Sequence, residues 1–179
     1  MNQKSDLEKY VEYGIAGVPE IKGSEKRYWL GEFRERVILA LTFEQIYRKE
    51  ALKVVEEKCK DKRVDKIILE DNVQSTVAEK FMELASKYDK DYKMIDTQNK
   101  LGEIALVLAS NEAVDEKDVL IKQMPILPDI FYNAKNKKLC KKHMQMLKEE
   151  APLFVDEFQE ITFLDRVMGV KCGVCDKID

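Results

Sequence analysis

Two short motifs near the end of the chain hold the residues with the clearest chemical potential. Cys140 and His143 form a CxxH motif, and Cys172 and Cys175 form a CxxC motif. Three thiols and one imidazole are a usual ligand set for tetrahedral Zn²⁺. The alternative is that the two motifs are unrelated and that the CxxC pair is a free dithiol. We favour one structural zinc ion held by all four side chains.

The spacing within each motif suits metal binding. On a helix, an offset of three residues places Cys140 and His143 on the same face. The glycine inside the CxxC motif allows a turn whose backbone N–H groups point at thiolate sulfur. The two pairs meet if the elements between them form a hairpin. A redox role is less attractive, because the CxxC motif does not open a helix in a βαβ unit.

A second group of residues lies in a basic and aromatic stretch near the N-terminus. Its candidates for contact with a ligand or with nucleic acid are Arg27, Arg34 and Arg36, interleaved with Tyr28, Trp29 and Phe33. These residue types suit phosphate contact and base stacking. Glutamates at positions 25, 32 and 35 offset most of this charge. We therefore favour an internal ion-pair network in which the aromatic side chains dock the stretch onto the core.

Evidence for catalysis is weak. The chain has a single histidine, and it contains no glycine-rich phosphate loop and no GxSxG nucleophile motif. Glu70 and Asp71 follow a predicted strand and could serve a small-molecule enzyme as a carboxylate pair, although we expect Asp71 to cap the next helix. Cys59 is expected to be a buried, inert thiol. Whether the protein is an enzyme stays open, with a non-catalytic role favoured.

Apolar runs alternate with amphipathic stretches through the first two thirds of the chain. The predicted strands are Val37 to Leu41, Lys66 to Leu69, Met94 to Asp96 and Leu106 to Leu108. Helices are predicted over residues 6–16, as one long helix after the capping pair Thr42 and Gln45, and along the face that carries Val77, Phe81 and Leu84. One helical turn is expected over residues 101–105. The pattern indicates one sheet covered by helices.

The composition changes after Met124, where prolines and a lysine-rich run appear. We predict an α/β domain over residues 1–125 and a helical C-terminal extension over residues 126–179. The extension is expected to be a helical pair packed on the core. Its second helix would place Phe154, Phe158, Ile161 and Leu164 on one side and stop at Gly169.

Composition and charge limit the classes of partner. The 31 basic and 34 acidic residues give a net charge of −3, which provides no general attraction to nucleic acid or to an anionic membrane. No apolar run is long enough to cross a bilayer, and no secretory segment is recognised. We expect a cytoplasmic protein with reduced cysteines or bound metal. A protein partner and nucleic acid both remain open, the latter disfavoured by the charge.

The stretch from Gly17 to Ile46, above all Arg27, Leu30, Gly31 and residues 33–37, resembles the hallmark segment of the YueI-like family of uncharacterised bacterial proteins. The resemblance extends more loosely over residues 5–125, and the last fifty residues look like an extension beyond the short members. It implies an α+β layered fold with a mixed four-stranded sheet. It implies no established activity.

A weaker resemblance concerns Ile67 to Asp71 and the later pair Leu101 and Gly102, which are similar to the core of L30e-like ribosomal proteins. It implies the layered arrangement of L30e-like and Bacillus chorismate mutase-like folds, and RNA binding is the alternative function that it suggests. The run that those proteins use against RNA is replaced here by Leu41 to Gln45. The replacement favours the fold analogy over RNA binding. The favoured function is thus a non-catalytic binding or regulatory domain with a zinc-tethered tail.

Overall fold

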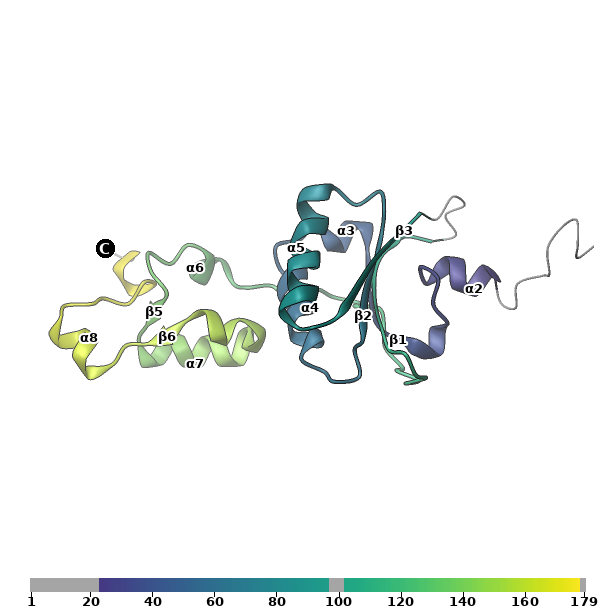
Figure 1. Ribbon diagram of the computed structural model, residues 1–179. Helices are drawn as coiled ribbons and strands as arrows, with labels where there is room; N and C mark the ends of the chain where they lie inside the picture. The colour runs from purple at the N-terminus through teal and green to yellow at the C-terminus, as the bar shows by residue number, and fades with distance from the viewer. Residues whose placement is uncertain (1–22, 97–101, 178–179) are drawn as a thin grey trace, which may run out of the picture.

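The computed structural model describes residues 23–96 and 102–177, and the predicted helix over residues 6–16 lies outside them. The described chain begins with helix α2 (Gly23–Tyr28) and a short 3₁₀ turn, η1 (Arg34–Arg36). Figure 1 shows the α/β part on one side and the C-terminal part on the other, with a long connection between them.

A four-stranded sheet forms the centre of the α/β part. Its strands are β1 (Val37–Thr42), β2 (Lys66–Glu70), β3 (Asp91–Ile95) and β4 (Ile104–Ala109), in the order β1-β4-β2-β3. β4 runs antiparallel to both β1 and β2, whereas β2 and β3 are parallel. The sheet is therefore mixed, which confirms the predicted fold class.

The central strands are buried on both faces, as their apolar runs require. All six residues of β4 and all five of β2 are buried, because α4 (Ala51–Cys59) and α5 (Ser75–Lys87) cover one face. On the other face lies a smaller cluster that includes Trp29 and Leu30 from the segment after α2. A continuous apolar run, rather than an alternating one, is the pattern expected of strands covered on both sides.

The helical prediction after Thr42 was right in its start and wrong in its length. Thr42 and Gln45 form a reciprocal capping box at the start of α3 (Phe43–Ile46). The chain then leaves the helical path over residues 47–50 before α4 begins. The long helix is thus two helices, and the second of them buries Ala51, Val54, Val55 and Cys59 against the sheet.

Three local predictions were also wrong. β3 begins at Asp91, three residues before the predicted start, since an edge strand with mostly exposed side chains lacks the apolar run that marks a buried one. The predicted helical turn at 101–105 is replaced in its described part by a bend and the start of β4. Asp71 does not cap α5, whose N-cap is Gln74 without a side-chain cap.

The C-terminal part is not the predicted helical pair. It consists of α6 (Asp129–Tyr132), β5 (Lys138–Leu139), α7 (Lys141–Glu150), the 3₁₀ helix η2 (Pro152–Glu157), β6 (Gln159–Glu160), α8 (Phe163–Val167) and η3 (Cys175–Lys177). β5 and β6 pair in parallel. Of the apolar residues of the predicted second helix, Phe154 lies in η2, Phe158 and Ile161 flank β6, and Leu164 lies in α8 and is 72% exposed.

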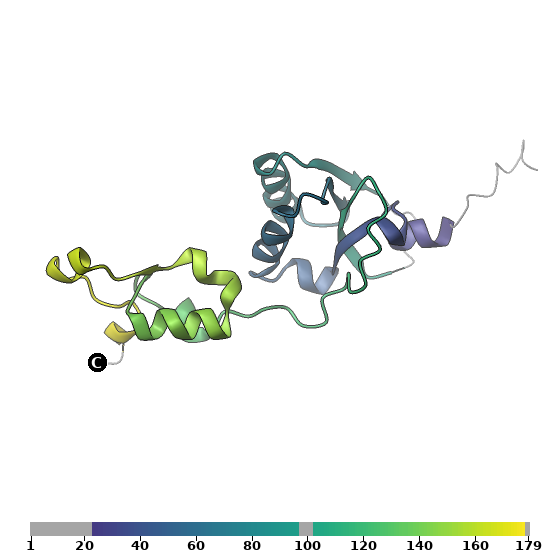
Figure 2. The same cartoon turned by 90° about the horizontal axis from the view of Figure 1, so that it is seen from below.

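The C-terminal part has an apolar cluster of its own, centred on Phe131, Leu139, Leu147 and Phe154. It meets the α/β part through Leu153, which packs against both clusters, and through a hydrogen bond from Tyr132 to Glu50. Residues 121–128 link the parts without regular secondary structure, as the view from below shows (Figure 2). The predicted boundary at residue 125 stays a prediction.

Among the described residues, no helix combines the length and the apolar character that crossing a membrane requires.

Candidate metal centre

The two cysteine-bearing motifs are brought together by the small parallel ladder. Cys140 is the N-cap of α7 and directly follows β5, and His143 lies one turn into that helix. After β6 and α8 the chain returns, and Gly173 accepts a hydrogen bond from Lys135 and donates one to Lys138. A Cβ atom at Gly173 would lie 2.3 Å from the carbonyl oxygen of Asn136, so this close return of the backbone requires glycine.

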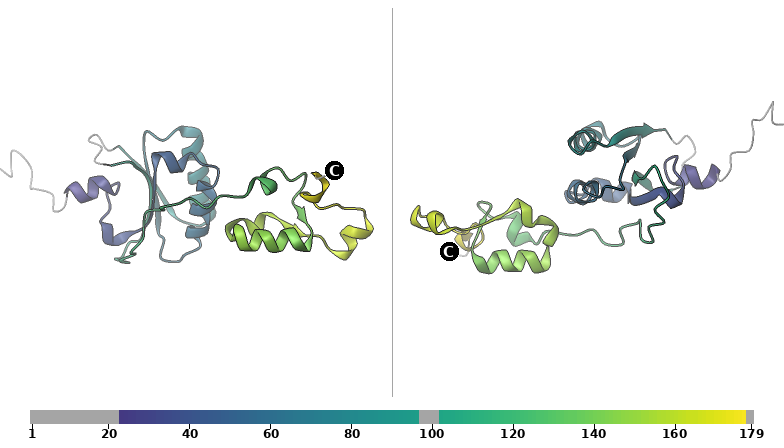
Figure 3. Two further views of the ribbon diagram at one scale, coloured as in Figure 1. Left: turned by 180° about the vertical axis from the view of Figure 1, so that it is seen from behind. Right: turned by 60° about the horizontal axis from the view of Figure 1, so that its bottom comes forward.

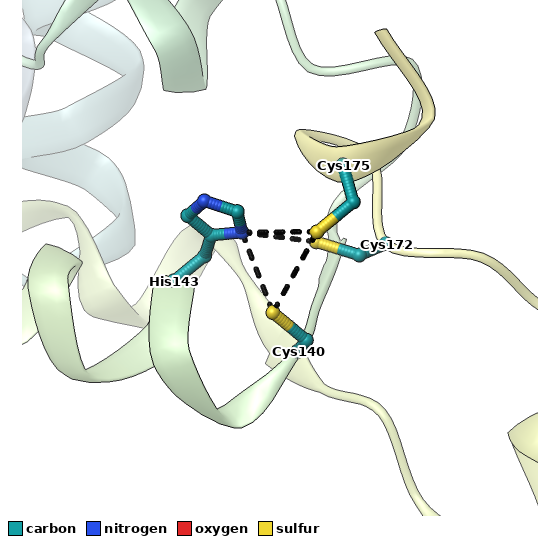
Figure 4. Close-up of side chains that lie close together, drawn as sticks. All are labelled: Cys140, His143, Cys172 and Cys175. Carbon is teal, nitrogen blue, oxygen red and sulfur yellow. Dashed lines mark hydrogen bonds between the residues drawn. The ribbon is translucent and has the colours of Figure 1, made fainter. Parts of the chain in front are cut away.

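Three thiols surround one imidazole nitrogen. The sulfur atoms of Cys140, Cys172 and Cys175 each lie 3.4 Å from Nδ1 of His143, and those of Cys140 and Cys175 lie 3.9 Å apart. All four potential ligand atoms lie within 4.8 Å of one another. Figure 4 shows them pointing at a common centre, with the second ring nitrogen of His143 directed away from it.

These distances match a tetrahedral metal site better than a set of hydrogen bonds. One imidazole nitrogen donates or accepts a single strong hydrogen bond, so it cannot serve three sulfur atoms equally. With Zn–S bonds of about 2.3 Å and Zn–N bonds of about 2.0–2.1 Å, a tetrahedral ion sets sulfur and nitrogen about 3.6 Å apart and two sulfurs about 3.8 Å apart. The cluster therefore could hold a metal ion.

The thiols have different acidities in this cluster. Burial raises the pKa of the Cys172 thiol, but backbone N–H groups of Cys140, Cys175 and Val174, together with the His143 side chain, lower it to about 6. For Cys175, burial and the neighbouring sulfur atoms of Cys172 and Cys140 raise the pKa to about 11. Backbone N–H groups aimed at the first sulfur of the CxxC motif are what the glycine-containing turn was expected to provide.

The three candidate arginines lie in different surroundings. Arg27 is exposed on α2. Arg34 donates from its guanidinium to the backbone oxygens of Glu116 and Lys117 and lies 5.6 Å from the Trp29 ring. These contacts tie the stretch after α2 to the loop that follows β4.

Arg36 lies 5.9 Å from the Phe33 ring. Nearby, Glu32 forms a buried ion pair with Lys66 of β2, with nitrogen and oxygen 2.7 Å apart. The stretch thus makes internal ionic and aromatic contacts of the kind expected of a docked segment.

The other candidates are separate from the cluster. Glu70 is fully buried and accepts hydrogen bonds from the backbone N–H and the side chain of Asn72, whereas Asp71 is exposed. Cys59 is buried in the main core, and burial raises the pKa of its thiol to about 11. Glu70 is therefore shielded from any substrate in solution, and Cys59 has the burial and the raised pKa typical of a structural thiol.

Comparison with known proteins identifies the family of the first two thirds of the chain. The family described as "Protein of unknown function (DUF1694)" matches residues 4–120. The chain belongs to this family. It is 29% identical over 119 residues to the "Uncharacterized protein YueI" of Bacillus subtilis (strain 168), an alignment that covers 66% of this chain and 89% of that protein.

A solved structure from the family supports the fold. The crystal structure of the YueI protein from Bacillus subtilis superposes with a TM-score of 0.54 at 26% identity, over 65% of this chain and 91% of that one. The YueI-like resemblance is thereby confirmed. The four residues of the metal cluster lie beyond residue 120, outside the region that the family matches.

The exposed apolar surface formed by α8 was not predicted from the sequence. Leu164 was predicted to lie on one side of a long helix with Phe154, Phe158 and Ile161, whereas α8 buries none of its residues. A signal was present, because Thr162 and Asp165 form a reciprocal capping box of the same kind as Thr42 and Gln45. That box marks a new helix start in the middle of the predicted one.

Proposed function

We propose that this protein is a non-catalytic binding or regulatory protein whose C-terminal part is held together by one structural Zn²⁺. The ligands would be Cys140, His143, Cys172 and Cys175. The observation that carries the proposal is the set of three sulfur atoms at 3.4 Å from one imidazole nitrogen. Four protein ligands close the coordination sphere, which is typical of structural and not of catalytic zinc.

The rest of the chain supports a non-catalytic role. The only histidine of the sequence is taken up by the cluster, so it is not available as a general base. The carboxylate of Glu70 is buried and hydrogen-bonded, which weighs against the alternative of a small-molecule enzyme at that end of the sheet. Arg34 and Arg36 make internal contacts, which weighs against the alternative of RNA binding.

The chemistry of the ligands also supports the expected location. Zinc binds thiolates, and the four cysteines are free of disulfides. Thiolate sites of this kind persist where cysteines stay reduced, as in the cytoplasm. A cytoplasmic location remains part of the proposal.

Elemental analysis of untagged protein tests the metal. We expect about one zinc per chain, as a closed four-ligand site requires, and a large loss in Cys172→Ser. Cys59→Ala is the matched control, because Cys59 is buried in the other part of the molecule and its loss should leave the zinc content unchanged. Substantially less than one zinc per chain, unchanged in Cys172→Ser, would contradict the proposal.

Cobalt substitution tests the geometry independently of affinity. Co²⁺ accepts the same tetrahedral sulfur and nitrogen ligands as Zn²⁺, and tetrahedral thiolate coordination gives intense visible absorption. We expect these bands with wild-type protein and weaker, shifted bands with Cys175→Ser. Pale octahedral Co²⁺ spectra in both proteins would exclude the four-ligand site.

A further inference from the structure

The four most exposed large apolar side chains described in the structure lie together on and beside α8. Phe163, Leu164, Val167 and Met168 are 78%, 72%, 70% and 81% exposed. Offsets of one, four and five residues from Phe163 place them on one side of a helix. Large apolar side chains gathered on one exposed surface mark an interaction site more often than single ones do.

This surface belongs to a well-defined helix. The Thr162 hydroxyl accepts from the N–H of Asp165, and the Asp165 carboxylate accepts from the N–H of Thr162. At the other end, Gly169 has a φ of 77° and Val170 donates its N–H to the carbonyl of Asp165, a closure typical of helix C-termini. Both ends of α8 are therefore capped, and the apolar side chains are displayed on a fixed frame.

The loop that carries α8 is closed at its base. Ile161 donates its N–H to the carbonyl of Leu139, and Cys172 joins the cluster with Cys140 and His143. Asp165 is also paired with Lys138 at 3.2 Å. The views of Figure 3 agree that α8 lies at the end of the molecule farthest from the sheet. A second molecule can approach it there without meeting the α/β part.

The size of the surface suits pairing with an identical one. If each of the four side chains is given about 150 Å², the lower end of the range for aromatic side chains, they offer roughly 450 Å² at these exposures. Two copies would bury about 900 Å² from these side chains alone, close to the ~1,000 Å² expected of a biological interface. The polar rim around them would supply the remainder.

The charges around α8 favour a second copy over a lipid surface. Lys138 is paired with Asp165, and Lys171 with Asp176 at 3.6 Å. Glu160 and Arg166 are both exposed beside the apolar residues. A rim that carries both positive and negative charges gives no net attraction to anionic lipid. In two copies related by a two-fold axis, the positive charges of one rim can face the negative charges of the other.

We propose that α8 is a self-association surface through which two copies of this chain form a symmetric dimer. The association rests on the apolar face of α8 and not on the identity of the metal. Its dependence on metal does rest on the proposed zinc site, since the cluster closes one side of the loop that presents α8.

Analytical ultracentrifugation of the full chain tests the dimer. At a concentration of about 100 µM, well above a micromolar dissociation constant, we expect twice the chain mass of 20.9 kDa. Leu164→Asp should sediment as a monomer with unchanged zinc content. Met82→Asp, at an exposed position of α5, is the matched control and should stay dimeric.

Other results distinguish a second copy from a lipid surface as the partner of α8, and the dimer proposal from the zinc proposal. A monomeric wild type, or a dimer that persists in Leu164→Asp, overturns the self-association. Self-association is also overturned if the wild-type protein is monomeric and sediments with vesicles of phosphatidylglycerol and phosphatidylethanolamine, and if Leu164→Asp no longer binds these vesicles. Loss of dimer in Leu164→Asp together with no zinc in the wild type supports the dimer and rejects the metal.

Discussion

The α/β part and the C-terminal part are stabilised in different ways. The α/β part buries whole strands: every residue of β2 and β4 is buried between helices and the segment after α2. In the C-terminal part, both strands have only two residues, and the last apolar members of its cluster are Cys172 and Val174. A region of about fifty residues rarely buries enough apolar surface to fold unaided and usually needs a staple.

The position of the metal cluster fits this difference. It brings the start of α7 together with the last turn of the described chain, where Cys172 is buried and Cys175 is exposed. The α/β part has no comparable need, because its strands form a continuous core and the segment after α2 is tied to that core by the ion pair of Lys66 with Glu32. We expect the extension and the family domain to unfold separately, and three experiments test this expectation.

Removal of the proposed Zn²⁺ should have the largest effect. Zinc binding to small folding units provides roughly 10–16 kcal/mol of apparent free energy, so a strong chelator should unfold most of residues 135–177. Hydrogen exchange should show the amides of α7 and β6 losing protection while those of β2 and β4 keep theirs. Equal loss in both parts would show that they form one cooperative unit. Cys59→Ala, which keeps all four candidate ligands, is the control and should respond to the chelator as the wild type does.

A matched pair of core truncations should have the next largest effect. Phe81 and Phe131 are each 1% exposed, one in each apolar cluster. Phe→Ala in a core costs about 3–5 kcal/mol. The sole tryptophan, Trp29, lies in the α/β part, so its fluorescence follows the unfolding of that part alone.

We expect Phe81→Ala to lower the denaturant midpoint reported by Trp29 strongly. Phe131→Ala should leave that midpoint nearly unchanged and instead increase proteolysis within residues 126–177. The same shift of the Trp29 transition by both variants would mean that the two clusters unfold together.

How deeply a strand is buried explains how well it could be predicted from the sequence. Val37 to Leu41 and Lys66 to Leu69 were predicted correctly because strands covered on both faces need unbroken apolar runs. β3 was placed too late, since Asp91 and Lys93 are exposed at the edge of the sheet. Burial on both faces leaves a strong pattern in a sequence, and an edge position leaves a weak one.

In the extension, residue type predicted the candidate ligands but not their support. The types and spacing of the four candidate ligands were sufficient to predict that they would come together, because few side chains bind zinc. Their convergence depends on the pairing of β5 with β6, which no local pattern of two residues can indicate. Phe154, Phe158 and Ile161 have helical spacing, but Phe154 lies in a 3₁₀ helix and the other two flank the short strand β6, and all three reach the same cluster.

The smallest predicted effect compares one motif in two settings. Thr42 and Thr162 are both N-caps in capping boxes, with hydroxyl to N–H distances of 3.3 and 3.2 Å. Replacing an N-cap threonine with alanine costs about 1 kcal/mol when the helix is part of the cooperative fold. Thr42→Ala should therefore lower the stability reported by Trp29 by about 1 kcal/mol, because α3 follows β1 directly and buries Ile46. Thr162→Ala should change it by less than about 0.3 kcal/mol, since α8 buries nothing and only its own end would fray. Equal losses in denaturant titrations of the two variants would show that α8 is coupled to the sheet after all.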